Sequence, residues 1–518
     1  MTAKSLGVAL VGIEGWVVQV EVGRQDGLPG MDITGLPAAS VKEARHRVRS
    51  AMRGGGYEWP LERMVVNFAP ADFPKFGTSF DLPLAVAVLV MTGVLAAASI
   101  EGAAFFGELA LDGIVRPVPG AINAALAARD AGHRRIFVAS ANAREAGQVP
   151  RIEVLPVRSL PELVEALSGR AVIEAAAGGL VSTADGGPAT DLRQVRGQAT
   201  ARRALEIAAA GGHNLLFVGP PGCGKTLLAR ALPGILPPLP IDEALEVTRV
   251  HSAAGLLRSG DGLVVRRPFR APHATASEAA LVGGGSPPTP GEVSLAHRGV
   301  LFLDEVLEFR RSAIEALRAP IEDRMVAIAR VGRSVRFPSS VMLVVALNPC
   351  PCGHLGNPRQ RCRCTPGQVQ AYQARLSGPL LDRIDLSVEL SPVEHEQLAE
   401  VREPESTDVV RARVVAARER QRLRAVQSAS TLAPLNADLG LGELDQAVPL
   451  GVRERRFLGR VARDLGISAR AWHRAIRIGR TIADLASADR VEEAHLAEAL
   501  SYRRALGPAE GGAHRVSP

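Results

Sequence analysis

A glycine-rich octapeptide between a strand-like run and a helical run constrains the fold of this chain most. Residues 219–226 read Gly-Pro-Pro-Gly-Cys-Gly-Lys-Thr, after the strand-like run 214–218 and before the helical run 227–232. The pattern GxxxxGK[ST] in this context forms a phosphate-binding loop. Its glycines let backbone N–H groups turn toward a phosphate, and the helix N-terminus adds partial positive charge. A chance Gly-rich turn would not explain both flanks, so the sequence predicts an α/β domain that binds a nucleoside triphosphate.

The polar groups of this loop have separate expected roles. Lys225 is expected to reach the β- and γ-phosphates of ATP, and the Thr226 hydroxyl to hold Mg²⁺. Cys223 occupies a variable position, so its thiol has no expected chemical role. The residues predicted to contact the nucleotide are Gly219, Pro220, Pro221, Gly222, Cys223, Gly224, Lys225, Thr226 and Leu227.

Two other apolar runs end in polar residues. Residues 299–303 lead into Asp304 and Glu305, and residues 341–347 lead into Asn348. Such apolar strands belong inside a parallel sheet, with their carboxyl ends beside the phosphate loop. We expect Asp304 to support Mg²⁺, Glu305 to polarise the attacking water and Asn348 to sense the γ-phosphate and that water. The alternatives are a solvated acidic strand end and an ordinary turn.

Length and composition indicate a multidomain globular protein. The chain has 518 residues, 47% hydrophobic and 22% charged, which suits roughly three domains. No signal peptide is evident at the start, and the longest apolar stretch, 82–98, is interrupted and shorter than a membrane span. We therefore expect a cytoplasmic protein without a membrane partner. The net charge of +7 comes mainly from arginine, which either GC-rich coding or nucleic-acid binding explains.

Changes in composition divide the chain into segments. Short strands alternate with helices in one domain, a low-complexity Ala/Gly piece follows as a linker, strands and helices alternate again, and a mostly helical domain precedes a disordered tail. The predicted segments are 1–168, the linker 169–190, the nucleotide-binding domain 191–392, the helical domain 393–508 and the tail 509–518.

Four of the five cysteines lie in one loop directly after Asn348. They are Cys350, Cys352, Cys362 and Cys364. Clustered thiols in a reducing compartment favour a metal over disulfides, and two pairs suit tetrahedral Zn²⁺. The C-x-C spacing is tighter than the usual C-x₂-C, and His354 is an alternative ligand. A structural zinc site and reduced, unliganded thiols both remain open.

These elements, in this order, resemble the AAA+ ATPases. Other segments bring the resemblance closer, to the magnesium-chelatase-like ATPases of the YifB/ComM family, over nearly the whole chain. The family implies a homo-hexameric ring in which a neighbour completes each ATP site. Arg383 matches the arginine finger, and Arg470 matches the second sensor, which couples the lid to the nucleotide; each could instead be a surface ion-pair partner. The segments that carry the closer resemblance are 268–273, 281–285, 290–297, 347–353 and, around the finger, 377–385.

A β-hairpin is expected at residues 325–337, after an inserted Gly/Pro-rich loop at 283–290. Similar hairpins in related ring helicases line the central pore and follow nucleic-acid phosphates. An ordinary solvated hairpin is the alternative. The arginines assigned to this hairpin are Arg324, Arg330, Arg333 and Arg336.

The N-terminal segment resembles the proteolytic domain of Lon proteases, at residues 75–81 and 107–120. Ser79 falls at the nucleophile position of the Ser–Lys dyad, but Ile122 falls where the base lysine belongs. An aliphatic side chain accepts no proton, and nothing suggests that Lys75 replaces the base, so we expect no peptidase activity. Ring assembly or substrate binding is the expected role. The helical arginines that either contact DNA or are merely solvated are Arg45, Arg47, Arg49 and Arg53.

The expected fold is α/β: an AAA+ P-loop domain, an N-terminal Lon-protease-like α+β domain and a C-terminal helical lid. The resemblance implies an ATP-hydrolysing hexameric DNA motor, a helicase or branch-migration enzyme. Its expected partner is single-stranded or branched DNA, in recombination during natural transformation. The alternative is a magnesium-chelatase-like ATPase that remodels proteins or complexes without DNA activity.

Overall fold

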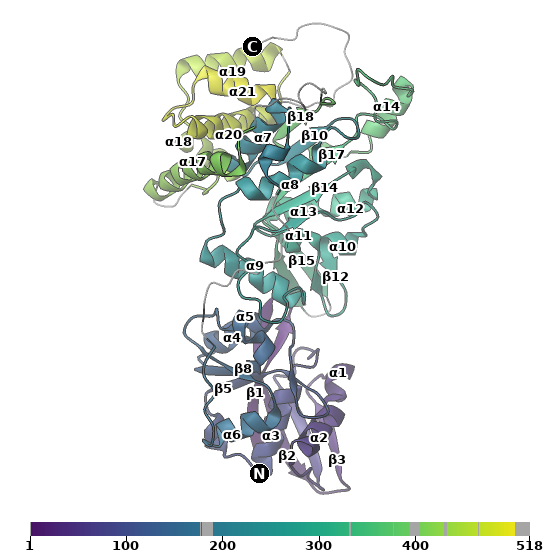
Figure 1. Cartoon of the computed structure of the whole chain (residues 1–518), viewed down its shortest axis with the longest axis vertical. Helices are drawn as coiled ribbons and strands as arrows, with labels where there is room; N and C mark the ends of the chain where they lie inside the picture. The colour runs from purple at the N-terminus through teal and green to yellow at the C-terminus, as the bar shows by residue number, and fades with distance from the viewer. Residues whose placement is uncertain are drawn as a thin grey trace.

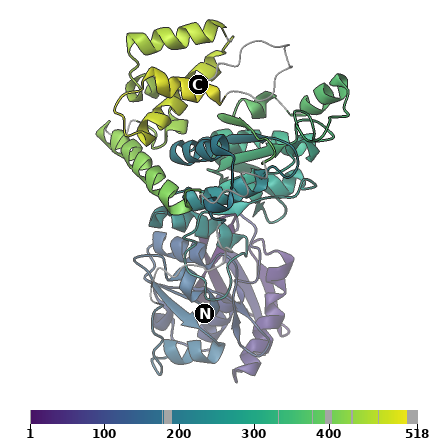
Figure 2. The ribbon, with the colours of Figure 1, turned by 45° about the horizontal axis from the view of Figure 1, so that its top comes forward.

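The computed structural model describes residues 2–176, 178, 190–330, 333–376, 378–393, 404–428, 432–464 and 466–502. The predicted tail 509–518 and most of the predicted linker 169–190 lie outside this range. The side chains of Arg330 and Arg333 also lie outside it. Three bodies follow one another along the long axis of the molecule, coloured purple to blue, teal to green, and yellow (Figures 1 and 2).

The N-terminal body is a mixed seven-stranded sheet covered by helices on both faces, ordered β3-β4-β2-β1-β5-β8-β9. Adjacent residues of β1 and β5 point to opposite faces, so Ala9 and Phe105 join one core while Val8 and Phe106 join the other. Its strands are β1 (Thr2–Val11), β2 (Glu14–Gln25), β3 (Gly30–Thr34), β4 (Arg63–Ala69), β5 (Ala103–Phe106), β8 (Arg135–Ala139) and β9 (Glu153–Val157), with the small pair β6 (Glu108–Leu109) and β7 (Val115–Arg116). Its helices are α1 (Ala39–Lys42), α2 (Ala44–Gly54), α3 (Asp81–Met91), α4 (Ala121–Asp130), α5 (Ala143–Ala146) and α6 (Leu160–Leu167), with 3₁₀ turns at Ala97–Ile100 and Ser140–Asn142.

The longest apolar stretch of the sequence forms the central helix of this body. α3 is apolar all round and almost every one of its residues is buried, as expected for a helix inside a core. Within the described residues, none of the helices combines the length and the apolarity needed to cross a membrane.

The middle body is a five-stranded parallel sheet ordered β11-β14-β17-β10-β18. Three inner strands are buried throughout, which explains their uninterrupted apolar sequences. The strands are β10 (Leu215–Val218), β11 (Phe269–Arg270), β14 (Val300–Leu303), β17 (Met342–Leu347) and β18 (Leu386–Glu389), with two hairpins, β12 (Gly283–Gly284) with β13 (Thr289–Pro290) and β15 (Met325–Arg330) with β16 (Arg333–Pro338). The helices are α7 (Ala199–Gly211), α8 (Lys225–Ile235), α9 (Ile241–Ala253), α10 (Glu278–Val282), α11 (Glu292–Leu295), α12 (Arg311–Ala316), α13 (Arg318–Asp323), α14 (Pro366–Gln373) and α15 (Gly378–Leu381), with 3₁₀ turns at Leu192–Gln194 and Val306–Glu308.

The C-terminal body is helical in the described residues, as expected for the lid. Its first helix joins the core of the sheet domain, because Val410, Val414 and Ala417 pack with residues of α7 and α8. The elements are α17 (Thr407–Gln427), α18 (Leu441–Ala447), α19 (Val452–Asp464), α20 (Ala469–Leu485) and α21 (Glu493–Ser501), with a 3₁₀ turn at Asn436–Asp438.

The N-terminal body is docked on α9 of the middle body. The Ser252 hydroxyl donates to the buried carboxylate of Glu145 at 2.5 Å and accepts from the backbone N–H of Gly120 at 3.0 Å. Apolar residues from both sides share one core. At a second contact, the β1–β2 turn meets the β15–β16 hairpin so closely that a Cβ on Gly12 would lie 2.4 Å from Val335. The two bodies are therefore joined by packed surfaces.

Candidate functional site

The phosphate loop connects β10 to α8, as predicted. Gly222 and Gly224 have φ values of 79° and 94°, so the loop needs glycine at both positions. Gly219 is required for another reason, since a Cβ there would lie 2.7 Å from the backbone oxygen of Leu390. These glycines allow the loop to end in the N-terminus of α8, where the first backbone N–H groups have no partner within the helix and can face an anion.

Lys225 links the phosphate loop to the end of β17. Its Nζ donates to the carbonyls of Gly219 and Pro220 at 2.7 and 3.0 Å, and to Oδ1 of Asn348 at 3.0 Å. Burial lowers the pKa of Lys225. The predicted sensor and the phosphate-loop lysine therefore lie in direct contact, although 123 positions separate them.

Thr226 and Asp304 form the second contact predicted at this sheet edge. The Thr226 hydroxyl donates to Oδ2 of Asp304 at 2.8 Å, and the other carboxylate oxygen accepts the backbone N–H of Glu305 at 3.0 Å. A hydroxyl and a carboxylate are the hard oxygen ligands that Mg²⁺ prefers, so this pair fits the metal. Glu305 is exposed, and its φ of 49° lies in the left-handed region. Such strain is often stored at functional sites.

Sequence reasoning missed Gln198, which precedes α7. Its Nε2 donates to the backbone oxygen of Cys223 at 3.2 Å and to that of Ser391 at 2.6 Å. It thereby ties the phosphate loop to the segment after β18. The side chain is placed by the left-handed φ of 53° at Gln198. The preceding Gly197 is the one local signal in the sequence for this backbone conformation.

Arg383 lies at the opposite end of the sheet from the phosphate loop. It precedes β18, and its carbonyl accepts a hydrogen bond from the Asn214 side chain, just before β10, at 2.9 Å. β10 and β18 are parallel, so the full length of β10, about 13 Å, separates this edge from the loop. The guanidinium of Arg383 forms an ion pair with Glu322 of α13.

Arg470 lies at the same edge as Arg383. From α20, its Nη1 contacts Oδ2 of Asp382 at 2.9 Å, and Arg474 donates to the backbone oxygen of Asp382 at 2.8 Å. The side chain of Arg470 is 76% exposed. A cavity of about 260 Å³ opens here between the lid and β18, lined in part by Asp385 and Tyr502. Both predicted arginines thus flank Asp382, away from the phosphate loop of their own chain.

The β15–β16 hairpin exists as predicted, and the two of its assigned arginines whose side chains the structure describes, Arg324 and Arg336, differ in position. Arg324 forms an ion pair with Asp438 in the 3₁₀ turn of the lid. This position does not support the prediction that Arg324 contacts nucleic-acid phosphates. Arg336 is exposed, whereas its neighbours Val335 and Phe337 are buried against the N-terminal body.

A row of exposed arginines lies along one face of α19, a feature that sequence reasoning missed. A shallow groove between α19 and the start of α21 is lined by exposed arginines and by Gly459. The spacing of three, four and three residues puts the arginines on one helical face about 15 Å long. The two outermost arginines have partners within the chain: Arg453 forms an ion pair with Glu493, and Arg463 donates a hydrogen bond to the carbonyl of Gly459. The row, called here the α19 arginine stripe, consists of Arg453, Arg456, Arg460 and Arg463.

The four clustered cysteines converge on one point. Their sulfur atoms all lie within 4.8 Å of one another. Cys352 accepts hydrogen bonds from the backbone N–H groups of Arg363 and His354, which lower the pKa of its thiol to about 6. His354 instead faces the Asn357 side chain at 3.5 Å, and it is not part of the cluster. The C-x-C spacing is therefore compatible with a shared site.

The residues at the Lon-like positions do not form a dyad with each other. The Ser79 hydroxyl donates to the Val8 carbonyl at 3.4 Å. Lys75 is fully buried, donates to the Pro70 and Phe73 carbonyls and lies 4.3 Å from the Phe73 ring centroid. Ile122 is buried in the core on the other face of the sheet.

The helical arginines of this body divide into two groups. Arg47 makes a two-pronged ion pair with buried Asp81 at 2.6 and 2.8 Å. Arg45, Arg49 and Arg53 are exposed. Only these three are therefore placed to contact a partner.

Three parts of the chain match families of magnesium chelatase subunits. Residues 191–398 match the family described as magnesium chelatase, subunit ChlI. Residues 20–142 match subunit ChlI of Mg-chelatase, and residues 404–503 match the C-terminal region of subunit ChlI.

Relatives cover almost the whole chain. An uncharacterized protein YifB of Salmonella typhimurium is 44% identical over 501 residues, which are 96% of each chain. The competence protein ComM of Haemophilus influenzae is 41% identical over 499 residues, again 96% of each. Lon protease 4 of Sorangium cellulosum is a distant relative, 28% identical over 35% of this chain and 24% of its own.

Proposed function

Since the chain belongs to the magnesium-chelatase-like YifB/ComM family of AAA+ ATPases, we propose that it is an ATP-driven DNA motor, a helicase or branch-migration enzyme. The proposal is carried by the paired contacts Lys225–Asn348 and Thr226–Asp304, in a chain that aligns with a competence protein along 96% of its length. Competence is the uptake of DNA, so we also propose recombination of incoming DNA during natural transformation as its setting.

Each residue of the site has a part in hydrolysis that follows from its chemistry. The Lys225 ammonium offsets negative charge on the β- and γ-phosphates of ATP, and the Asn348 amide is positioned by that ammonium beside the same phosphates. Thr226 and Asp304 would hold Mg²⁺, which neutralises charge that develops on the phosphate oxygens. Glu305 accepts a hydrogen bond from the attacking water and orients it.

The arginines support the proposal that the working unit is a ring. Arg383 and Arg470 lie at the sheet edge opposite the phosphate loop, so neither completes the site of its own chain in this arrangement. In a head-to-tail ring the same edge would face a neighbour's nucleotide. An arginine there stabilises charge on the transferred phosphoryl group. A homo-hexamer, as in the family resemblance, would build six such sites.

The α19 arginine stripe supports DNA as the substrate of the motor. Guanidinium groups pair well with phosphate oxygens, and a row of them on one helical face suits a phosphodiester backbone. Gly459 lies within the row and leaves space for close approach.

Reversing charge at the centre of the stripe should weaken DNA binding. The double variant Arg456→Glu/Arg460→Glu is expected to raise the Kd for single-stranded DNA about tenfold or more, because two phosphate contacts are replaced by repulsion. The slope of log K against log salt should fall in magnitude by about 1.4. Fluorescence anisotropy with a labelled oligonucleotide at several salt concentrations measures both quantities.

A matched variant tests whether the effect belongs to the stripe. Arg45→Glu/Arg49→Glu on α2 makes the same change in net charge on another exposed helix. If those arginines are merely solvated, this variant binds DNA like the wild type. Equal loss from both double variants would contradict the proposal that the stripe is distinguished from the other exposed arginines as the DNA-binding surface.

The proposed function is tested by adding DNA to an ATPase assay. Single-stranded, forked and four-way DNA should each be titrated, and we expect at least one to raise the rate of ATP hydrolysis. The family descriptions name a chelatase subunit, and they favour a remodelling ATPase as the second candidate. That candidate hydrolyses ATP at a rate that no DNA structure changes.

A further inference from the structure

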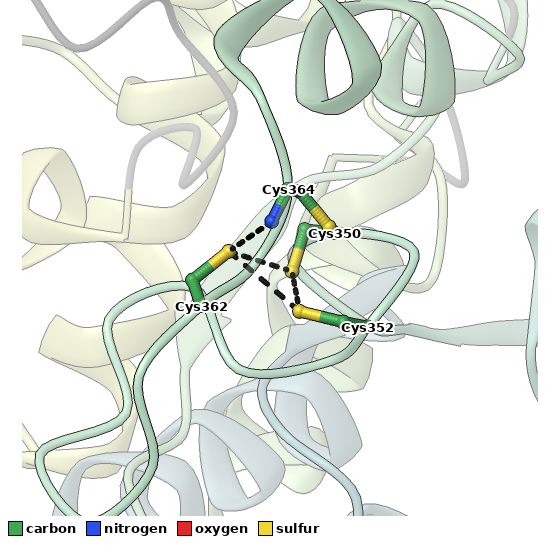
Figure 3. A group of neighbouring side chains, drawn as sticks. All are labelled: Cys350, Cys352, Cys362 and Cys364. Atoms are coloured by element: carbon green, nitrogen blue, oxygen red, sulfur yellow. Dashed lines mark hydrogen bonds between the residues drawn. The ribbon is translucent and has the colours of Figure 1, made fainter.

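The four clustered cysteines come from two short segments of one loop (Figure 3). Cys350 and Cys352 lie on the segment that leaves β17, and Cys362 and Cys364 lie on the segment that enters α14. The Sγ atoms of Cys350 and Cys352 are 3.4 Å apart, and each lies 3.7 and 3.6 Å, respectively, from that of Cys362. The thiols therefore meet where the two ends of the loop lie side by side.

These distances fit one metal ion. Four sulfurs at about 2.3 Å from a tetrahedral Zn²⁺ lie about 3.8 Å from one another, whereas a disulfide requires about 2.05 Å. An iron–sulfur cluster would hold its cysteines farther apart, because several iron atoms lie between them. Besides the two backbone N–H groups that reach Cys352, the N–H of Leu355 donates to the sulfur of Cys350 at 3.3 Å and that of Cys364 to the sulfur of Cys362 at 3.4 Å. Such donors orient thiolate ligands and stabilise their charge.

The same loop lies against the phosphate loop. Cys350 follows the Asn348 sensor by two residues, and its thiol is buried. Gly353 has a φ of 79°, and a Cβ on it would lie 2.7 Å from Cδ of Pro221. On the other side, Gln373 of α14 donates to the carbonyl of Pro349 at 3.0 Å. The loop is therefore fixed between α14, β17 and the phosphate loop.

We infer that Cys350, Cys352, Cys362 and Cys364 bind one Zn²⁺ ion and that the loop closed by this metal positions the phosphate loop through the contact of Gly353 with Pro221. The metal has no part in the chemistry of ATP. It restrains the segment that carries Asn348 and supports the outer side of the loop that holds the nucleotide. The second half of this inference rests on nucleotide binding at the phosphate loop, whereas the metal site does not.

The zinc content of the purified chain, measured without nucleotide or DNA, tests the proposed metal site. Elemental analysis of the full chain should find about one zinc per chain. The Cys362→Ser/Cys364→Ser variant should hold almost none, while Cys223→Ser, which changes a cysteine outside the cluster, should keep its zinc. In case the double variant fails to fold, the wild-type chain exchanged with Co²⁺ should show the visible d–d bands of tetrahedral cobalt thiolate. A chain that holds no zinc and shows no such bands contradicts the metal site.

Substitutions at two glycines of the cysteine loop test whether this loop positions the phosphate loop. Gly353 and Gly356 both have left-handed φ values, so alanine strains the backbone similarly at each, but a Cβ on Gly356 meets nothing within 4 Å. We expect Gly353→Ala to raise the Kd for a fluorescent ATP analogue about tenfold, because it displaces Pro221, and to retain zinc. Gly356→Ala should match the wild type in both measurements.

The pattern of results separates this inference from the proposed function. Equal nucleotide affinity of Gly353→Ala and Gly356→Ala, with comparable thermal unfolding, would overturn the positioning role. Failure of the wild type to bind any nucleotide would instead contradict the proposed function and leave the zinc result standing on its own.

Discussion

Alanine in place of Lys225 is expected to lower kcat/KM for ATP by about 10³-fold. The ammonium is the buried cation that joins the phosphate loop to Asn348, so its removal takes away both the charge that meets the phosphates and the anchor of the sensor. Initial rates of phosphate release, measured against ATP concentration, give the comparison.

Lys42 provides the matched control, because it is an exposed lysine on α1 in the N-terminal body. Lys42→Ala should hydrolyse ATP at the wild-type rate. If Lys225→Ala also kept its turnover, the assignment of the nucleotide site to residues 219–226 would be wrong.

Substitution of Arg383 by alanine is expected to reduce kcat by about 10³-fold while leaving ATP binding nearly unchanged. The guanidinium would act on a neighbour's nucleotide, so the phosphate loop of the altered chain stays complete. Arg375→Ala removes an exposed arginine that is ion-paired to Glu308, and it should preserve kcat. Steady-state rates together with the Kd for an ATP analogue separate the two effects.

Mixing two inactive variants tests whether Arg383 acts between subunits. In a ring assembled from equal amounts of Lys225→Ala and Arg383→Ala chains, about a quarter of the interfaces join an intact Lys225 to an intact Arg383. ATP hydrolysis should therefore reappear in the mixture. A mixture as inactive as its components would mean that Arg383 serves the site of its own chain.

Local patterns in the sequence were sufficient to predict which residues meet at the candidate nucleotide site. An apolar strand followed by a polar residue indicates both a buried parallel strand and a side chain at its carboxyl edge, which is why Asp304 and Asn348 could be predicted to meet the phosphate loop. The structure confirms the contacts with Thr226 and Lys225. The hairpin at residues 325–338 was likewise visible as two short alternating runs.

Ion pairs between residues that lie far apart in the chain could not be predicted from local sequence patterns. Nothing near Arg324 indicates that it pairs with Asp438, and nothing near Arg47 indicates the buried Asp81, so both appeared equivalent to exposed arginines. The edge on which Arg470 lies depends on how α20 packs against the sheet domain. The α19 arginine stripe is different, since its helical spacing was present in the sequence and could have been recognised.

The most direct test of the central claim, that ATP hydrolysis drives work on DNA, is a strand-displacement assay on a forked duplex labelled on one strand. We predict ATP-dependent release of the labelled strand by the wild-type chain and none by Lys225→Ala. Release that needs no ATP, or the absence of release together with an ATPase rate unaffected by single-stranded, forked and four-way DNA, would contradict the account.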